Sequence, residues 1–319
     1  MKLGDRDGDR VDRVGPAARD GLQGVDDLGG HDGHTTMLLG AARYLAETRN
    51  FDGRLAFIFQ PAEENEGGAG VMIDDGLFEQ FPVEEVYGLH NWPGLPLGEI
   101  SLRTGPAMAA FDIFEMTVTG RGAHGAMPHQ GIDPIVVAAQ IVNALQTIPS
   151  RRTNPIDAVT VSVTQFHAGD TWNVIPDSAV IRGTTRSFRK EVQEQIEADI
   201  TRIAEGICAS QGARMTLDYQ RRYPALVNSE RESGIAAEAA AGIVGDDMVT
   251  RNANPIMGSE DFAFMLNAKP GCYVLLGNAG ADGKGGVPVH NPSYDFNDEA
   301  LVIGASYWAR LAESALSQS

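Results

Sequence analysis

The order of the secondary-structure elements that the sequence predicts constrains its fold more than any other feature. Residues 55–59 and 86–89 are short apolar runs, which are typical of strands buried on both faces of a parallel sheet. Amphipathic helices are predicted over residues 35–47 and 67–78, so helices and strands alternate in this part of the chain. This alternation predicts an α/β fold with a mostly parallel sheet.

The pattern changes near Gly105 and returns near residue 221. The elements predicted in between are a strand (111–120), a helix (134–147), two strands (158–166 and 179–188), a helix (191–210) and a strand (215–219). The order β-α-β-β-α-β is that of a ferredoxin-like unit. We therefore predict an inserted α+β domain over residues 106–220, within a catalytic domain made of residues 1–105 and 221–319. The α/β pattern resumes with helices over 230–244, 260–266 and 299–317 and a strand over 272–276.

Composition limits the classes of partner. The 319 residues are 43% hydrophobic and 21% charged, which is typical of a globular protein with room for two domains. A net charge of −18 argues against nucleic acid and against an anionic membrane surface. Cys208 and Cys272 are the two cysteines, and they lack the spacing of a thiolate metal site. With no signal peptide visible, we expect a reduced, cytoplasmic setting.

Two adjacent carboxylates, Glu63 and Glu64, follow the predicted strand over residues 55–59. Ligands of open α/β sheets bind outside the carboxyl ends of the strands. Burying two carboxylates is costly unless a positive charge lies beside them, so a divalent metal ion is one explanation. The alternative is a solvated acidic turn, because the residues that follow are polar and rich in glycine.

His31, His90 and His290 each lie at or just past the edge of a predicted element, as Glu64 does. A single histidine is more often a hydrogen-bonded structural residue than a ligand. Four such residues beside loops at one end of a sheet indicate a common site. Three imidazoles and one carboxylate suit zinc, manganese, cobalt or nickel. We expect His34 to cap the following helix or to support a ligand.

Five motifs of this sequence occur in the order that is found in one family of enzymes. They are Gly30-His31-Asp32-Gly33-His34-Thr35, Pro61-Ala62-Glu63-Glu64, Gly88-Leu89-His90-Asn91-Trp92-Pro93, Asn173-Val174-Ile175-Pro176-Asp177 and His290-Asn291-Pro292. Together they closely resemble the M20 metallopeptidases, and most of all the amidohydrolases that include hippurate hydrolase and the indole-acetyl-amino-acid hydrolases. The resemblance runs from about Gly30 to the end of the sequence.

The resemblance implies that the enzyme cleaves the amide bond of an N-acyl amino acid to a carboxylic acid and a free amino acid. It implies up to two divalent ions per subunit, with His31, Glu64, His90 and His290 as ligands. It also implies that Glu63 is the general base, which takes a proton from the attacking water and later gives it to the leaving amine.

Four further positions match residues that contact the substrate in the family. His124 matches a histidine of the inserted domain that steadies the oxyanion, often in the partner subunit's site, which implies a homodimer. Asn173 and Arg186 match residues that hold the substrate, and an arginine can bind both oxygens of a carboxylate. Gly258 matches a loop that the substrate approaches. A capping asparagine, a surface arginine and a turn glycine are the structural alternatives.

The chain departs from the family pattern at its start. Gly29 stands where this branch has a cysteine whose thiolate bridges the metals, and residues 1–30 do not match the family's upstream strand. The charged composition of these residues predicts disorder, and a shifted reading frame or a misjudged start would explain it. We expect a missing strand and a weak second metal. A degenerate member without hydrolase activity and a dipeptidase are the alternatives, and the His90 motif argues against the second.

Overall fold

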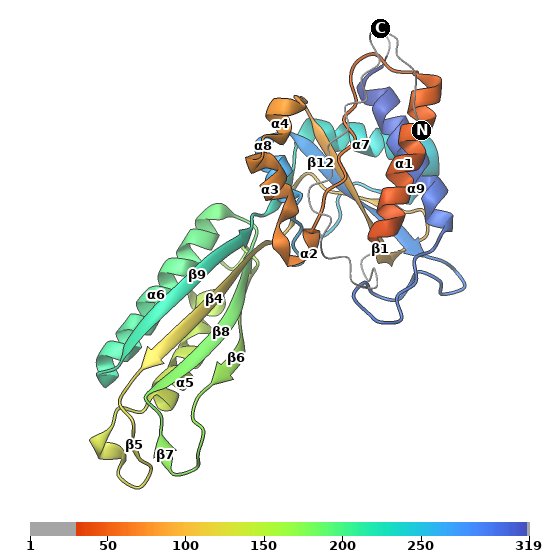
Figure 1. Ribbon diagram of the computed structural model, residues 1–319. Helices are drawn as coiled ribbons and strands as arrows, with labels where there is room; N and C mark the ends of the chain where they lie inside the picture. Colours follow the sequence, from red (N-terminus) through yellow and green to blue (C-terminus); the bar gives the residue numbers. More distant parts are fainter. Residues whose placement is uncertain (1–29, 318–319) are drawn as a thin grey trace.

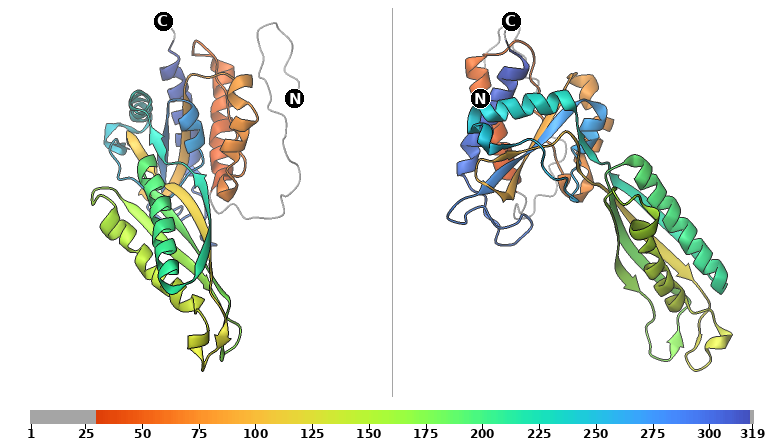
Figure 2. Two further views of the ribbon diagram at one scale, coloured as in Figure 1. Left: turned by 90° about the vertical axis from the view of Figure 1, so that its left-hand side faces the viewer. Right: turned by 180° about the vertical axis from the view of Figure 1, so that it is seen from behind.

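The computed structural model describes residues 30–317, which form two units (Figure 1). The first is an α/β unit that contains both ends of the described chain. The second is an elongated antiparallel unit that projects from the first, and two connections join them (Figures 1 and 2). Among the described residues, no helix is long and apolar enough to cross a lipid bilayer.

The sheet of the α/β unit has the strand order β1-β12-β2-β11. β1 runs parallel to β12, and β2 runs parallel to β11, whereas β12 and β2 are antiparallel. This arrangement confirms the predicted α/β fold with a mostly parallel sheet. The four strands are β1 (Val86–Pro96), β12 (Gly271–Ala279), β2 (Ile100–Ser101) and β11 (Val249–Thr250).

Helices cover both faces of this sheet. Side chains of a strand alternate between the two faces, so β12 contributes to a core on each side. Cys272, Val274 and Leu276 of β12 share a core with helices α1, α7 and α9, while Tyr273 and Leu275 pack with α3, α4 and α8. A Cβ atom at Gly304 of α9 would lie 1.9 Å from the Met37 sulfur, so glycine lets α9 approach α1 closely. The helices are α1 (His31–Thr48), α2 (Glu63–Glu66), α3 (Gly68–Asp74), α4 (Leu77–Gln80), α7 (Glu230–Val244), α8 (Ala263–Ala268) and α9 (Glu299–Ala315).

The antiparallel unit has the strand order β6-β8-β4-β9, with helices α5 and α6 packed on it around an apolar core. The chain order β4-α5-β6-β8-α6-β9 is the ferredoxin-like order that the sequence predicts. At the end far from the α/β unit, β5 (Ala123–His124) pairs with β7 (Val174–Ile175) (Figure 1). The main elements are β4 (Ala110–Thr119), α5 (Pro134–Leu145), β6 (Val159–His167), β8 (Ser178–Ser187), α6 (Lys190–Gln211) and β9 (Arg214–Tyr223).

Short elements complete the chain. Near the boundary of the two units, β3 (Gly105–Met108) pairs with β10 (Leu226–Asn228). The other short helices of the described chain are the 3₁₀ helices Pro128–Gln130 and Asp246–Met248 and the π-helix Ile148–Arg152.

Three predictions about the N-terminal part of the described chain are wrong. Helix α1 begins at His31 rather than at residue 35, so His31 and His34 both lie in its first turn. His34, the fourth residue of this helix, bonds to Asn91, so of its two expected roles support of a ligand applies and capping does not. The helix predicted over residues 67–78 is two helices, because Gly76 has a left-handed backbone (φ 88°). Residues 55–59 form no strand within the described chain.

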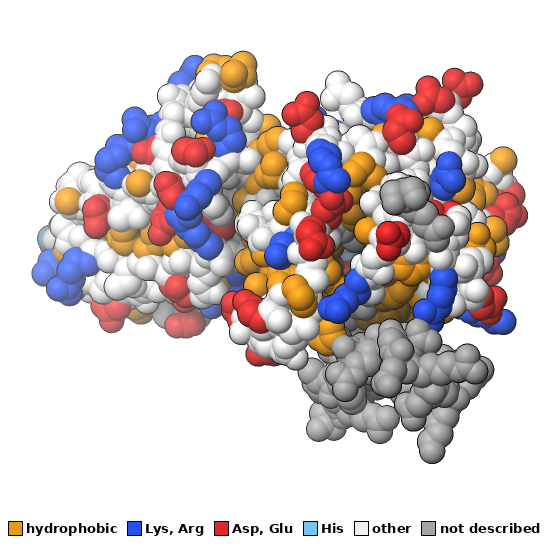
Figure 3. All heavy atoms as spheres, turned by 90° about the horizontal axis from the view of Figure 1, so that it is seen from above, with side chains coloured by type: hydrophobic (Ala, Val, Ile, Leu, Met, Phe, Trp, Pro, Cys, Tyr) orange, Lys and Arg blue, Asp and Glu red, His pale blue; other side chains and the backbone are white. Residues whose placement is uncertain are grey.

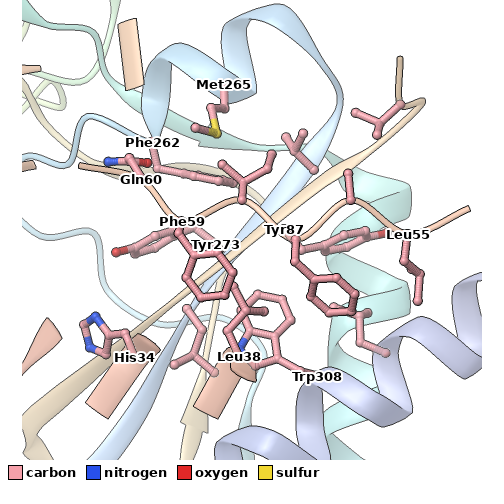
Figure 4. Close-up of a pocket in the computed structure, with 18 of the residues that line it drawn as sticks. His34, Leu38, Leu55, Phe59, Gln60, Tyr87, Phe262, Met265, Tyr273 and Trp308 are labelled. Atoms are coloured by element: carbon pink, nitrogen blue, oxygen red, sulfur yellow. The ribbon is translucent and has the colours of Figure 1, made fainter. Parts of the chain in front are cut away.

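A cavity of about 750 Å³ lies between residues 54–60 and the outer edge of β1 (Figure 4). Its walls are mainly apolar and include Leu38, Tyr87, Phe262 and Trp308. Within the described chain, β1 pairs with β12 alone, so its other edge faces this cavity. Figure 3 shows that apolar side chains reach the surface of the α/β unit among acidic and basic ones.

Candidate active site

The predicted ligands from α1, α2 and β1 lie together at one end of the cavity. His31 is the first residue of α1, Glu63 and Glu64 open α2, and His90 lies on β1. Ligand atoms of His31, Glu63 and Glu64 lie within 4.8 Å of one another, as do those of His31, His34 and His90. The ring centroids of His31 and His90 are 5.9 Å apart. His31 therefore belongs to both groups and links them.

The ring of His90 is oriented by the backbone. Its Nδ1 lies 2.6 Å from the carbonyl oxygen of Asn91, which accepts a hydrogen bond when Nδ1 carries the proton. That tautomer leaves a lone pair on Nε2, as a metal ligand requires. Burial, the largest cause, lowers the pKa of His90, which favours the neutral ring.

His34 supports the ligands instead of capping the helix. Its Nε2 lies 3.0 Å from the backbone nitrogen of Asn91 and 2.6 Å from the side-chain oxygen of the same residue. Asn91 in turn donates to the hydroxyl of Tyr294. Burial and the neighbouring His90 and His31 hold the pKa of His34 well below its usual value. A neutral His34 therefore fixes the peptide that follows His90.

The acidic side chains are crowded. Oxygens of Glu63, Glu260 and Asp261 lie within 4.8 Å of one another. Burial, followed by the charges of Glu260, Glu64 and Asp261, raises the pKa of Glu63 to about 8. Neutral imidazoles beside carboxylates that repel one another are the donors that a divalent cation would stabilise. The residues present thus fit a divalent metal ion.

His290 comes from a loop between β12 and α9, where it has a left-handed backbone (φ 65°). Its Nδ1 lies 3.5 Å from Oε1 of Glu64. Such a backbone is costly for a residue with a side chain and persists where the surroundings hold it. The fold therefore brings His290 next to Glu64, although the two are far apart in the sequence.

Arg186 and Gly258 lie close to the boundary between the two units. Arg186 donates from Nη1 to the hydroxyl of Ser259 over 2.9 Å, and its guanidinium lies 4.1 Å from the ring centroid of Phe111. The carbonyl of Gly258 accepts a hydrogen bond from the backbone of Ala109. A Cβ atom at Gly258 would make only ordinary contacts, so the packing does not require glycine there.

His124 and Asn173 lie together, but at the far tip of the antiparallel unit (Figure 1). The backbone of Gly125, next to His124, donates to the carbonyl of Asn173 over 2.7 Å. Both residues are exposed. Within one chain, the structure does not bring them to His31, Glu63 and the other predicted site residues. Gly29, the position of the expected bridging cysteine, lies outside the described residues.

The sequence analysis missed two residues that contact the loop of Glu63. Tyr223, the last residue of β9, donates from its hydroxyl to the carbonyl oxygen of Glu63 over 2.6 Å. Asp261 accepts hydrogen bonds from the side chain of Gln60 and, over 2.9 Å, from the backbone of Ala69. The adjacent acids Glu260 and Asp261 were a visible signal, because they repeat the pattern of Glu63 and Glu64.

Comparisons with known proteins place the chain in a family of enzymes. The profile of the Peptidase family M20/M25/M40 matches residues 19–314. Hippurate hydrolase of Campylobacter jejuni is 40% identical over 283 residues, which are 89% of this chain and 72% of the relative. N-acetylcysteine deacetylase of Bacillus subtilis is 38% identical over 284 residues, with the same two coverages of 89% and 72%.

A solved structure is similar in fold as well as in sequence. The crystal structure of a dinuclear metal binding peptidase from the M20 family of Bacillus subtilis is 35% identical, with a TM-score of 0.77. The match covers 92% of this chain and 74% of that one. The family match and the structural match both extend over the α/β unit and the antiparallel unit. The chain belongs to the peptidase family M20/M25/M40, and within it to the metal-dependent amidohydrolases.

Proposed function

We propose that this amidohydrolase cleaves N-acyl amino acids with acetyl or aromatic acyl groups, and releases a carboxylic acid and a free amino acid. The relatives named hippurate hydrolase and N-acetylcysteine deacetylase support this class of substrate. The observation that carries the proposal is the position of Glu63. Its carboxylate is partly buried beside His31 and Glu64, which are proposed metal ligands, and its pKa is raised to about 8.

His31, Glu64, His90 and His290 would hold divalent metal ions, up to two per subunit, from the series zinc, manganese, cobalt and nickel. When bound, the metal polarises the amide carbonyl and lowers the pKa of water. Glu63 has the role of general base: an oxygen of its carboxylate takes a proton from the attacking water and passes it to the leaving nitrogen. A group that must accept and return a proton near neutral pH works best with a pKa near the working pH.

Arg186 is the proposed partner of the substrate's free carboxylate. Its guanidinium lies beside the loop that contains Gly258 and Ser259, and a planar guanidinium can bind two carboxylate oxygens. Ser259 would then exchange its hydrogen bond with Arg186 for one with the substrate. The hydroxyl keeps Arg186 extended toward the α/β unit until a substrate arrives.

We also propose a homodimer in which His124 and Asn173 reach the partner subunit's site. The tip of the antiparallel unit supports this, since Trp172 is fully exposed and Val174 and Met127 are about half exposed. Exposed apolar side chains that gather in one place mark interaction sites. Residues 106–220 would then be a lid and dimerisation domain on a catalytic domain of residues 1–105 and 221–319. The cytoplasm is the proposed location.

Substitution of Glu63 by glutamine tests the reaction. Glu63→Gln keeps the shape of the side chain and cannot take a proton, so turnover should fall on the order of a hundredfold or more. Its metal content, measured by mass spectrometry, should remain close to that of the wild type. Glu64→Gln is the matched comparison, and it should lose metal together with activity. A Glu63→Gln protein that loses metal instead would contradict the role of base.

A further inference from the structure

The loop that carries Glu63 and Glu64 has an unfavourable backbone. Ala62, directly before Glu63, is left-handed (φ 53°), and Gly67 after the short helix α2 is left-handed as well (φ 71°). A non-glycine residue in this region costs on the order of 1 kcal/mol or more, so contacts from elsewhere must hold it. The loop itself is tight, because a Cβ atom at Gly68 would lie 1.8 Å from the carbonyl oxygen of Pro61.

Asp261 contacts both ends of this loop. Its side chain is fully buried, and one oxygen accepts a hydrogen bond from the side-chain amide of Gln60, at the start of the loop. The other oxygen accepts a hydrogen bond over 2.9 Å from the backbone N–H of Ala69, at the end of the loop. One carboxylate thus closes the loop, as a bridge between residues on either side of Glu63 and Glu64.

The carboxylate of Asp261 also lies close to other acidic side chains, which repel it when they are ionised. Its oxygens lie within 4.8 Å of oxygens of Glu63 and Glu260. A negative charge buried beside other acids destabilises the fold unless hydrogen bonds offset part of the cost. An apolar residue could fill the space without that repulsion, but it could not hold Gln60 and Ala69 together.

We propose that Asp261 is a positioning residue that fixes the loop of Glu63 and Glu64 in its strained conformation through these two hydrogen bonds. The inference rests on the proposed roles of Glu64 as a metal ligand and Glu63 as the base. Without the bridge, Ala62 is free to return to an ordinary conformation, and both carboxylates turn away from His31. Asp261 therefore acts on metal binding and catalysis through geometry, without contact with the substrate.

The experiment compares two substitutions that separate the hydrogen bonds from the charge. Asp261→Ala removes both hydrogen bonds, and Mn²⁺ affinity measured by calorimetry should fall about ten- to a hundredfold, as for other residues that orient metal ligands. Asp261→Asn removes the charge but not the bridge. Its oxygen can accept from Ala69, while the amide of Gln60 rotates to accept from its NH₂ group. Affinity close to that of the wild type is expected for Asp261→Asn.

Two further measurements distinguish positioning from general destabilisation. Hydrogen exchange at the amide of Ala69 should become faster in Asp261→Ala and stay slow in Asp261→Asn. Asp199 of α6 is a suitable control, since it is 3% exposed and accepts hydrogen bonds from Arg152 and Arg202 in the antiparallel unit. Asp199→Ala should lower the melting temperature and leave Mn²⁺ affinity unchanged.

Several outcomes would overturn the proposal. Unchanged Mn²⁺ affinity in Asp261→Ala, with a melting temperature lowered as in Asp199→Ala, would leave Asp261 a purely structural residue. Equal losses in Asp261→Ala and Asp261→Asn would assign the effect to charge. If Asp261→Ala does not fold, Gln60→Ala removes one of the two bonds and should weaken Mn²⁺ binding by a smaller factor; wild-type affinity there would also overturn the proposal. A wild-type protein that binds Mn²⁺ but does not hydrolyse N-acyl amino acids would contradict the proposed function alone.

Discussion

Glu63, which is partly buried, and Asp261, which is fully buried, are acids whose pKa values the fold raises. Burial, followed by nearby acidic charges, raises the pKa of Glu63 from 4.5 to about 8. The pKa of Asp261 rises from 3.8 to about 7, mainly because of burial and despite the hydrogen bond from Ala69. Both shifts have burial as their largest cause, because water solvates an ionised carboxylate poorly there, and the neighbouring acids raise both pKa values further.

These shifts predict how the stability of the metal-free protein depends on pH. In the unfolded chain both acids lose their protons near pH 4, whereas the folded chain keeps them up to about pH 7 to 8. The folded state therefore binds more protons in this interval, and the free energy of unfolding falls as the pH rises. The lowered pKa values of His34 and His90 act in the opposite direction, but only up to about pH 7.5, above which unfolded imidazoles are neutral as well.

Thermal unfolding without metal between about pH 7.5 and 8.5 measures this effect. The melting temperature should decrease over the interval, and added Mn²⁺ should reduce the decrease because a cation stabilises the ionised acids. Glu63→Gln should show a shallower decrease, since glutamine does not titrate. The same slope in Glu63→Gln as in the wild type would show that the retained proton belongs to another group.

At the scale of residues, the sequence predicted which side chains gather at the candidate site better than it predicted the residues that hold them in place. His31, Glu64, His90 and His290 were chosen by residue type and by their places beside predicted elements, and the fold brings them to one region. The roles of Asn91 and Asp261 were not predictable, because they depend on which backbone groups lie opposite their side chains. Such contacts are set by tertiary packing between residues that are far apart in the sequence.

Among the elements, β1 has two different edges. Its inner edge pairs with β12 from Val86 to Trp92, and its outer edge faces the cavity within the described chain. Unpaired backbone groups at a strand edge exchange with water or pair with another chain. The backbone amides on the two edges of β1 should therefore differ in their protection from hydrogen exchange.

Hydrogen exchange followed by NMR tests this difference. Every second amide of β1 points away from β12. Apart from the amide of Asn91, which donates to His34, these amides should exchange on the order of a hundredfold faster than those of β12, which is flanked by two strands. Amides of β1 that bond to β12 are the internal control. Uniform protection along β1 would reveal that another segment covers the outer edge.

The elements with local signals were the predictable ones. Helix α7 matches the predicted range of residues 230–244 because its alanine-rich face is amphipathic along its full length. Residues 55–59 have the composition of a buried strand, but a strand requires a neighbour, and the cavity separates them from β1. The composition of a segment indicates that it can form a strand, but it forms one only where a neighbouring strand lies within hydrogen-bonding distance.

For the whole molecule, the arrangement of the two units decides which predicted residues can meet. The insertion of a β-α-β-β-α-β unit was visible in the order of elements, and the structure confirms that order. The position of His124 could not be predicted from the order of elements. It lies at the far end of the antiparallel unit, away from the other site residues, because this unit is elongated (Figure 1).

Mixing of two inactive variants tests the proposed homodimer. If His124 serves the partner subunit's site, His124→Ala and Glu63→Gln should each be inactive as pure dimers. Hybrid dimers, formed by subunit exchange, contain one site with both functional residues, so part of the activity should return. Light scattering and a fluorescent label verify the dimers and their exchange. Complete exchange without any return of activity would confine His124 to its own chain.

The hydrogen bond of Tyr223 links the antiparallel unit directly to the loop of Glu63. Tyr223 ends the last strand of the antiparallel unit, and its hydroxyl bonds to the carbonyl of Glu63, the proposed base. A swing of that unit about its two connections must either carry the Glu63 peptide along or break this bond. Movement of the antiparallel unit would therefore also shift the peptide that carries the proposed base. If such a movement admits substrate and releases product, the same movement would align and misalign the general base.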